Sequence, residues 1–521
     1  MVTSMDLDSA KNVASAGNVP TECHVTTYLN WRLILLDKPF VKLFRTPRNG
    51  YFLDVNKNDL IPISDESYNY LEVILNNEGS MADLHKIPEE LIELESEGYL
   101  QAGSVVKEIR HPYVKMMPTI LERNLSNLIL QITQDCNFRC SYCTYSGAGG
   151  SFQRTHTKNA MSWDTAKKAI DFFWSRSVDS NNITISFYGG EPLLGFELIK
   201  KVVEYSKRMF SGKRLVFTIT SNGTLLDDEK IRYLDDLKCS LMLSLDGTKE
   251  INDKYRVFAN GGGTYDTVMQ SIQRIKEIAP SMLQRMRISM VLMPESDYDL
   301  NSNIRKDCDA LSDVSIIATA VDYDEGTPEY TDDFVQKAEY HIFLAFLAHY
   351  GRVHSGATSP VATLTVDSSI KDISKFEKPS GLRQEDAPSG PCIPGQTRLF
   401  INVHGEMLPC ERVNENSAAM AIGAIDKGFD INNVNRFLEF GNITKDNCIN
   451  CWCFRYCDLC AKRADDGSKD LSGKRKLSFC NGVRTQAINK IEYYLLLKEI
   501  PVLYQEHIRR TSHQRNVGDN I

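Results

Sequence analysis

The sequence predicts an α/β fold over residues 126–350, in which six strand–helix units form a parallel sheet curved into a partial (β/α)6 TIM-like barrel. Two observations predict it. Short apolar runs rich in β-branched residues alternate with helical segments, and polar motifs directly follow several of these runs. Parallel α/β folds place their chemistry at the carboxyl ends of the strands. The predicted strands are 128–132, 183–188, 215–220, 241–245, 287–292 and 314–321.

Residues 26–105 predict a small separate domain of winged-helix type, preceded by a polar tail over residues 1–25. Apolar runs on both sides of PRNG predict a hairpin in which Asn49-Gly50 supplies a positive φ. Ser64 is placed to cap a first helix, and a second helix begins at Pro88. Residues 106–125 are expected to link this domain to the barrel.

The C-terminal part of the chain differs in composition. Residues 351–391 are rich in Ser, Pro, Thr and Asp without a period, and they are expected to form a linker or insertion. Eight of the 14 cysteines follow within residues 392–485, which predicts a separate domain, and residues 486–521 predict a C-terminal helix.

Charge and hydropathy exclude several classes of function. The 60 basic and 68 acidic residues are dispersed, so we expect no nucleic-acid partner. No secretion signal and no apolar run of about 18 residues is present, which predicts a cytoplasmic protein with no membrane partner. Thiols stay reduced in the cytoplasm, so the cysteines are expected to serve metal or redox chemistry.

The stretch DCNFRCSYC places Cys136, Cys140 and Cys143 on one loop after the first predicted strand. Three thiolates can hold three irons of a [4Fe–4S] cluster and leave the fourth iron open to a ligand. On spacing alone, a zinc site with a fourth ligand from elsewhere and an accidental grouping stay open as alternatives. The position at the end of a parallel strand favours a catalytic site.

Further motifs follow in order along the predicted barrel: CNFRCSYC with the aromatic Tyr142, then YGGEP, TSNGTLL, SLDG, DKYR and GGGTYD. Together they resemble the motifs of radical S-adenosylmethionine (SAM) enzymes, in particular those that modify peptides. The resemblance implies that SAM chelates the open iron through its amino and carboxylate groups. Cleavage of SAM by the reduced cluster then yields a 5′-deoxyadenosyl radical that abstracts hydrogen.

The resemblance also implies which residues contact SAM. Gly189 and Gly190 would let the backbone approach it, and Glu191 would accept a hydrogen bond from its ammonium group. Arg256 would bind its carboxylate, unless this arginine is solvated on a surface helix. Ser244 and Asn222 would bind near the ribose or methionine, although Asn222 could equally form a turn after its strand.

The C-terminal cysteines resemble the SPASM extension of peptide-modifying radical enzymes, which binds two auxiliary [4Fe–4S] clusters. The resemblance implies one cluster on Cys448, Cys451, Cys457 and Cys480, and another on Cys392, Cys410 and Cys460, for which no fourth ligand can be named. The last pair is spaced C-x2-C where the family has C-x3-C, and Cys453 is an additional thiol whose role stays open. A pair of zinc ribbons is the alternative.

The whole layout resembles maturases of ribosomally made peptides (RiPPs) of the sactipeptide and ranthipeptide type. It implies a leader-binding domain at residues 26–105, which would add the leader peptide to a sheet edge. The implied reaction is thioether formation in a cysteine-containing precursor peptide, with three [4Fe–4S] clusters, SAM and an electron donor such as flavodoxin or ferredoxin. Formylglycine formation, a carbon–carbon cross-link and a non-catalytic zinc protein are the alternatives.

The expected catalytic residues are Cys136, Cys140 and Cys143, together with Glu411. Glu411 follows Cys410 directly, where related sulfatase-maturing enzymes carry a catalytic carboxylate. A solvated position or a role in tuning a cluster is the alternative for this glutamate.

Overall fold

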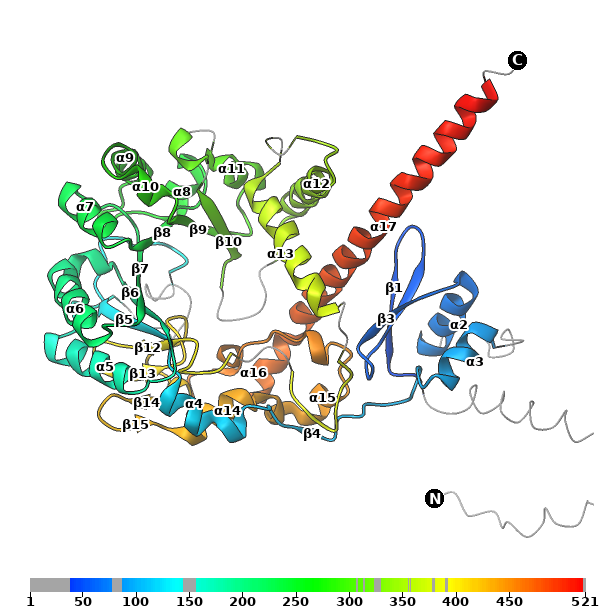
Figure 1. The fold of residues 1–521 in the computed structure, drawn as a ribbon, viewed down its shortest axis with the longest axis horizontal. Helices are drawn as coiled ribbons and strands as arrows, with labels where there is room; N and C mark the ends of the chain where they lie inside the picture. Colours follow the sequence, from blue (N-terminus) through cyan, green and yellow to red (C-terminus); the bar gives the residue numbers. More distant parts are fainter. Residues whose placement is uncertain are drawn as a thin grey trace, which may run out of the picture. The chain divides into compact units, whose positions relative to one another are not determined.

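The computed structural model describes residues 38–518, except for 77–86, 144–155, 306–307, 313, 323–328, 355, 357, 377–379 and 389–391. The predicted tail at residues 1–25 lies outside the described residues. The chain divides into two compact units, Met1–Ser104 and Val105–Ile521. The first unit is the blue part of the ribbon in Figure 1.

The first unit contains a three-stranded antiparallel sheet followed by two helices. Its elements are β1 (Val41–Arg45), β2 (Gly50–Asp54), β3 (Asp59–Ile63), α2 (Asp65–Asn76) and α3 (Glu89–Ser96). Strand β2 lies in the centre of the sheet, and its fully buried Phe52 packs with Leu71 of α2 and Leu91 of α3 in one core. Ser64 caps α2 as expected, because the Ser67 amide donates to its Oγ at 3.2 Å.

The prediction of a positive φ at Asn49-Gly50 was wrong. The amide of Asn49 donates to Thr46 Oγ1 at 3.0 Å, which closes the hairpin, and Gly50 is already part of β2. Glycine is required there for packing, since a Cβ would lie 2.6 Å from the Tyr68 ring. The positive φ of 53° belongs to Asn58 in the next turn.

The second unit is built on a sheet of ten strands. Its first part consists of six parallel strands in chain order, as predicted. They are β5 (Asn127–Thr133), β6 (Asn182–Gly189), β7 (Arg214–Ser221), β8 (Ser240–Ser244), β9 (Met286–Leu292) and β10 (Ser315–Ala320). These strands are largely buried and supply the main hydrophobic core.

Helices follow the strands of the barrel. They are α5 (Trp163–Ser175), α6 (Phe196–Met209), α7 (Asp228–Asp236), α8 (Lys249–Tyr255), α9 (Tyr265–Ile278), α10 (Pro280–Leu283) and α11 (Tyr298–Ser302). In Figure 1, α5, α6, α7 and α9 follow one another around the outer side of the curved sheet. The other side of the strands is not covered by these helices. It is therefore available to the C-terminal segment and to the cavity described below.

The C-terminal segment continues the same sheet. Strand β12 (Leu399–Ile401) pairs in parallel with β5, and β13 (Glu406–Leu408), β14 (Gly423–Ala424) and β15 (Gly428–Phe429) add antiparallel strands. The remaining elements are α14 (Ile431–Leu438), η8 (Phe440–Thr444), α15 (Lys445–Ile449), α16 (Gly473–Ser478) and α17 (Cys480–Gly518). The C-terminal helix thus begins six residues before its expected start at residue 486.

Both segments expected as linkers contain regular structure. Residues 106–125 include β4 (Glu108–Ile109), which pairs with β11 (Glu385–Asp386), and α4 (Met117–Arg123), which buries Met117 and Leu121. Residues 351–391 include α13 (Pro360–Phe376), whose Ala362 and Val366 pack with Leu497 of α17. Small and β-branched residues form this buried face, so no clear apolar period is visible in the sequence.

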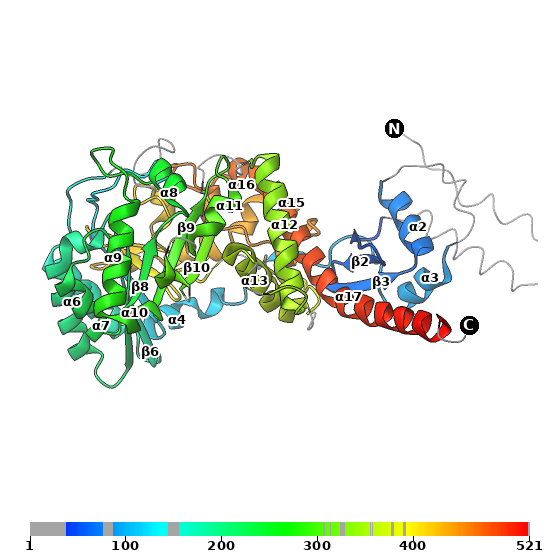
Figure 2. The same ribbon diagram turned by 90° about the horizontal axis from the view of Figure 1, so that it is seen from above.

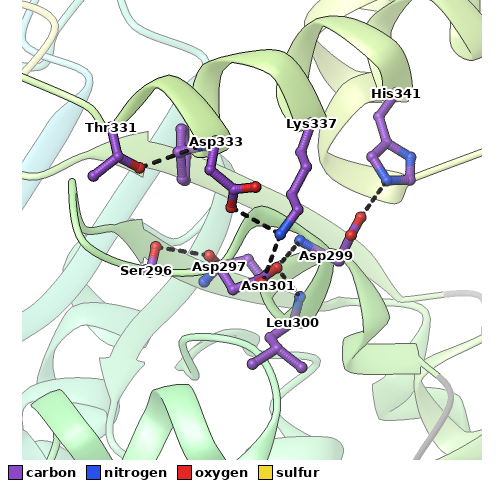
Figure 3. A network of polar contacts seen from close by, with 10 residues as sticks. Ser296, Asp297, Asp299, Leu300, Asn301, Thr331, Asp333, Lys337 and His341 are labelled. Atoms are coloured by element: carbon purple, nitrogen blue, oxygen red, sulfur yellow. Dashed lines mark hydrogen bonds and ion pairs between the residues drawn. The ribbon is translucent and has the colours of Figure 1, made fainter.

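Polar contacts fasten α12 (Asp332–His349) to the edge of the barrel (Figure 3). Thr331 caps the helix, and Lys337 lies 2.8 Å from both Asp333 and Asp297. His341 Nε2 lies 2.7 Å from Asp299 Oδ1 in α11. Figure 2 shows α12 beside α11 and α13 at the end of the series of parallel strands. Across the described part of the chain, no helix is both long enough and apolar enough to cross a bilayer.

Candidate active site

A cavity of about 370 Å3 lies at the carboxyl ends of the parallel strands. Every strand of the parallel series contributes to its wall through its last residues or the loop that follows. Ten of the predicted site residues line it: Cys136, Cys140, Tyr142, Cys143, Gly189, Gly190, Asn222, Ser244, Arg256 and Glu411. The topology therefore gathers motifs that are far apart in the sequence around one space.

The three cysteines lie on the loop after β5, which is held by backbone hydrogen bonds to residues 255–259. The Phe138 amide donates to Cys136 Sγ at 3.4 Å. Burial raises the pKa of the Cys136 thiol to about 12 and that of Cys140 to about 11. A positively charged metal centre would supply the compensation that these buried thiolates need. The chemistry of the trio therefore fits a metal or cluster.

Two glycines at the end of β6 bring its backbone directly against the cysteine loop. Gly190 N donates to Thr133 O, and a Cβ on Gly190 would lie 2.0 Å from the carbonyl oxygen of Asp135. Gly189 has φ +141°, and its Cβ would lie 2.2 Å from the Thr133 oxygen. A side chain at either position would push the cysteine loop away, so glycine is required to keep this loop in place. Glycine would also let a ligand approach the backbone closely.

Glu191 does not reach the cavity wall. Its Oε1 accepts hydrogen bonds from the Leu193 amide at 3.0 Å and from Ser221 Oγ at 2.9 Å, and its Oε2 accepts from the Asn222 amide at 2.8 Å. The side chain is only 1% exposed. Its carboxylate therefore joins the ends of β6 and β7, and through Asn222 it positions a residue that does line the cavity. The expected contact with an ammonium group of SAM has no support in this geometry.

Arg256 belongs to a buried polar network, so it is not a solvated surface arginine. Its Nη1 donates to the Tyr142 hydroxyl at 2.7 Å, and that hydroxyl donates to Asp246 Oδ2. Burial by itself lowers the pKa of Arg256, but the charges of Tyr142, Cys140 and Asp246 outweigh this effect and raise the pKa above its ordinary value. Its buried Nε has no hydrogen-bond partner among the described residues. Because Arg256 lines the cavity, its guanidinium can bind an anionic group there.

Asp246 was missed by the sequence analysis as a site residue, although it is the aspartate of the SLDG motif. Its Oδ1 accepts from the Val291 amide at 3.0 Å, so it joins β9 to Tyr142. Burial raises the pKa of Asp246, and the nearby Arg256 acts in the opposite direction. Its place within a quoted motif was the signal that could have identified it.

The C-terminal segment supplies the opposite side of the cavity. Glu411 Oε1 accepts a hydrogen bond from Arg398 at 2.8 Å, and Arg412 follows it in the wall. Asp322, after β10, lies 2.6 Å from Arg463 Nη2 and also pairs with Lys462. Burial raises the pKa of Asp322, but these two cations outweigh it and hold the pKa below its ordinary value. No sequence motif identified Asp322, Arg412 or Arg463.

The other cysteines gather at two further places. Cys448, Cys451, Cys453, Cys457 and Cys480 line a second cavity of about 30 Å3. A second group consists of Cys392, Cys410 and Cys460, whose thiols lie close enough to interact. Burial raises the pKa of Cys410 to about 12, and the charges of Glu411, Cys460 and Cys392 also raise it. Within the described ranges, no three Cys, His, Asp or Glu side chains converge as the ligands of one bare metal ion do.

Residues 130–305 match the family model of the Radical SAM superfamily. These residues form a radical SAM domain. Such a domain binds a [4Fe–4S] cluster and SAM, and the cavity wall fits them with three thiols on one loop and a cationic arginine. The predicted resemblance to radical SAM enzymes is thereby confirmed for this part of the chain.

Curated relatives match parts of this chain. A cysteine-type anaerobic sulfatase-maturating enzyme of Clostridium novyi is 30% identical over 156 residues, which are 29% of this chain and 40% of that enzyme. The radical SAM cyclopropyl synthase TigE of Paramaledivibacter caminithermalis is 24% identical over 268 residues, 48% of this chain and 56% of that one. The chain thus spans about half the length of the curated relatives it matches.

A solved structure extends the likeness beyond the radical SAM domain. Native anSMEcpe with bound AdoMet and Kp18Cys peptide superposes with a TM-score of 0.51 at 19% identity, and the match covers 76% of this chain and 99% of that one. This likeness shows the fold alone. It confirms a radical SAM fold with a large mixed sheet, in which β13, β14 and β15 supply the antiparallel strands.

Proposed function

We propose that this protein is a radical SAM maturase that forms thioether cross-links in a ribosomally made, cysteine-containing precursor peptide. The observation that carries the proposal is the composition of the main cavity. Its wall includes the Cys136, Cys140 and Cys143 trio and also Glu411, the neighbour of Cys410. The substrate carbon at the radical SAM domain and a sulfur at the Cys392, Cys410 and Cys460 set would thus face one space.

Each residue of the wall has a role in this proposal. The three cysteines of the β5 loop would hold three irons of the cluster. Arg256, which lines the cavity, would bind the SAM carboxylate, while Tyr142 and Asp246 hold the guanidinium in place. Glu191 would act indirectly, by positioning Asn222. Ser244 would supply a neutral hydrogen bond from the end of β8.

The reaction balances in atoms and electrons. With SAM and a cluster held at Cys136, Cys140 and Cys143, the site would supply a 5′-deoxyadenosyl radical, which would remove one hydrogen atom from the acceptor carbon. The cysteine thiol loses its proton and its sulfur bonds to that carbon, so one electron is left over. The auxiliary cysteine sets would provide the iron–sulfur site that receives this electron. The peptide loses two hydrogens in total.

Three features support a peptide substrate. The first unit presents a three-stranded antiparallel sheet whose outer strands, β1 and β3, each pair on one side only among the described residues, and a leader peptide could extend such an edge. The C. novyi relative is named for sulfatase maturation, and the superposed anSMEcpe structure holds a peptide. The winged-helix and SPASM assignments, the three-cluster count, the flavodoxin or ferredoxin donor and the cytoplasmic location belong to this proposal.

Formylglycine formation is the second candidate, and one observation favours it. Glu411 lies in the cavity wall with its Oε1 bonded to Arg398, at the position where sulfatase-maturing enzymes carry a carboxylate. The two products differ in their sulfur. A thioether retains the sulfur but leaves no thiol to alkylate, whereas formylglycine made from cysteine has lost it.

The test uses reconstituted full-length protein, SAM, a reductant and a cysteine-containing precursor peptide. We expect a peptide lighter by two hydrogens that no longer reacts with iodoacetamide. About twelve irons per chain should fall to about eight in the Cys136→Ala, Cys140→Ala, Cys143→Ala variant, which should not cleave SAM. A product that has lost sulfur supports formylglycine formation, and zinc in place of iron would refute both functions.

A further inference from the structure

A buried lysine lies against the cysteines of the second cavity. We call Cys448, Cys451, Cys457 and Cys480 the C-terminal cysteine set. Lys476 of α16 is 2% exposed, and its Nζ lies 3.2 Å from Cys448 Sγ. The same Nζ donates to Thr444 Oγ1 at 2.7 Å and lies 3.2 Å and 3.4 Å from the carbonyl oxygens of Phe440 and Gly441. Four acceptors thus surround the three N–H bonds of the ammonium group.

A second cation reaches the same set from α17. Arg484 also lines the second cavity, and a hydrogen bond to Cys451 raises the pKa of its guanidinium. The two cations therefore contact two different sulfurs of one cysteine set. The Cys392, Cys410 and Cys460 set has a different environment, because the Glu411 carboxylate acts on Cys410. The fold thus places two cations directly against sulfurs of the C-terminal cysteine set. Beside the other set, Arg398 pairs with Glu411, and the two act in opposite directions on Cys392.

A purely structural role would explain only part of the Lys476 geometry. Its bonds to Thr444 and to the η8 carbonyls fasten η8 to α16 and satisfy the buried ammonium. The contact with Cys448 adds a charged donor to a sulfur. Charge and hydrogen bonds at the sulfurs set the reduction potential of an iron–sulfur cluster. Reduction adds one negative charge, which a buried cation stabilises more strongly than an exposed one does.

We propose that Lys476 and Arg484 raise the reduction potential of a cluster held by the C-terminal cysteine set. This inference rests on the proposed function, since it requires a cluster at these four cysteines. The two residues position charge and take no part in bond making. They make this set the easier of the two auxiliary sites to reduce.

The experiment is a redox titration monitored by electron paramagnetic resonance. It uses the full chain with Cys136, Cys140 and Cys143 changed to alanine, so that only auxiliary signals remain. The signal that Cys480→Ser removes identifies the C-terminal set. Lys476→Gln keeps donors but loses the charge, Lys476→Arg keeps the charge, and Arg484→Gln removes the second cation. Lys490→Met is the matched control, because this lysine pairs with Asp458 beside Cys457 but is 43% exposed.

We expect the midpoint potential of that signal to become more negative in Lys476→Gln and in Arg484→Gln, and to stay near the parent value in Lys476→Arg and Lys490→Met. An unchanged potential in iron-loaded Lys476→Gln and Arg484→Gln would overturn the inference and leave the proposed function intact. If the position 476 variants do not load iron, Arg484→Gln decides. If the parent protein shows no cluster that depends on Cys480, the proposed function fails first.

Discussion

Replacing Gly190 by alanine tests how closely the end of β6 must approach the cysteine loop. The new Cβ would lie 2.0 Å from the carbonyl oxygen of Asp135 and 2.6 Å from its carbonyl carbon. Both are backbone atoms, so no side chain can rotate away. Ordinary van der Waals contact begins at 3.4 Å, and the loop would therefore have to retreat by about 1.4 Å.

That retreat would displace Cys136, the residue that follows Asp135. A misplacement of about 1 Å at a reacting centre lowers the rate about 100-fold, and overpacking of a close contact costs about 1–3 kcal/mol. We expect Gly190→Ala to slow SAM cleavage about 100-fold and to lower the free energy of unfolding by about 1–3 kcal/mol. The protein should still fold, because the clash is confined to one loop.

The assay is the rate of 5′-deoxyadenosine formation by reconstituted protein, with iron content and urea unfolding measured in parallel. Gly212→Ala is the control: its φ is +87° and no atom lies within 4 Å of the new Cβ, so it carries backbone strain without a clash. The control should cleave SAM at close to the wild-type rate. A Gly190→Ala variant with wild-type iron content and wild-type cleavage would refute the reasoning.

Three further predictions concern buried polar groups. Tyr142→Phe removes the hydroxyl between two buried charges and should lower the free energy of unfolding by about 1–3 kcal/mol in urea titrations. Glu191→Gln places an amide NH2 among three donors and should cost a similar amount, with slower SAM cleavage; an unchanged rate would count against its positioning role. Lys462 and Arg463 lower the folded-state pKa of Asp322. The stability that these ion pairs contribute is therefore fully present above the unfolded-state pKa, and it is lost as the pH falls through the folded-state pKa. Asp322→Asn should therefore lose less stability than wild type on acidification below about pH 4, and equal losses would contradict the ion-pair assignment.

Most of the radical SAM domain could be predicted from the sequence, because short stretches of the chain determine its strands and the motifs that follow them. Parallel strands buried on both faces are continuous apolar runs, and the six runs correspond to β5–β10. The carboxyl ends of such strands meet at one edge, so motifs after the runs indicated a common site. Nine residues of those motifs line one cavity, together with Glu411, which was predicted from its place beside Cys410.

The parts that could not be predicted depend on tertiary contacts. Glu191 stands in a motif, but the motif does not tell whether its carboxylate faces a ligand or the amides of β7 and its neighbours. Lys476 stands in GKRKLS, a stretch that is typical of a solvated helix, and only its packing against η8 buries it. In α13, the apolar face is made of small and β-branched residues, which leaves too weak a period to indicate a helix.

Strand β5 connects the two halves of the main cavity, because it borders both the cysteine loop and the C-terminal segment. Its last residue leads into the cysteine loop, while its outer edge pairs with β12, Leu399 opposite Leu128. The buried Gln131 of β5 accepts a hydrogen bond from the Val403 amide at 3.0 Å and donates to Glu415. A hydrogen-bonded ladder, rather than a flexible linker, therefore fixes the distance between the radical SAM cysteines and the residues around Cys410. In the thioether-forming reaction that we propose, this rigid spacing would restrict which pairs of peptide residues can be joined.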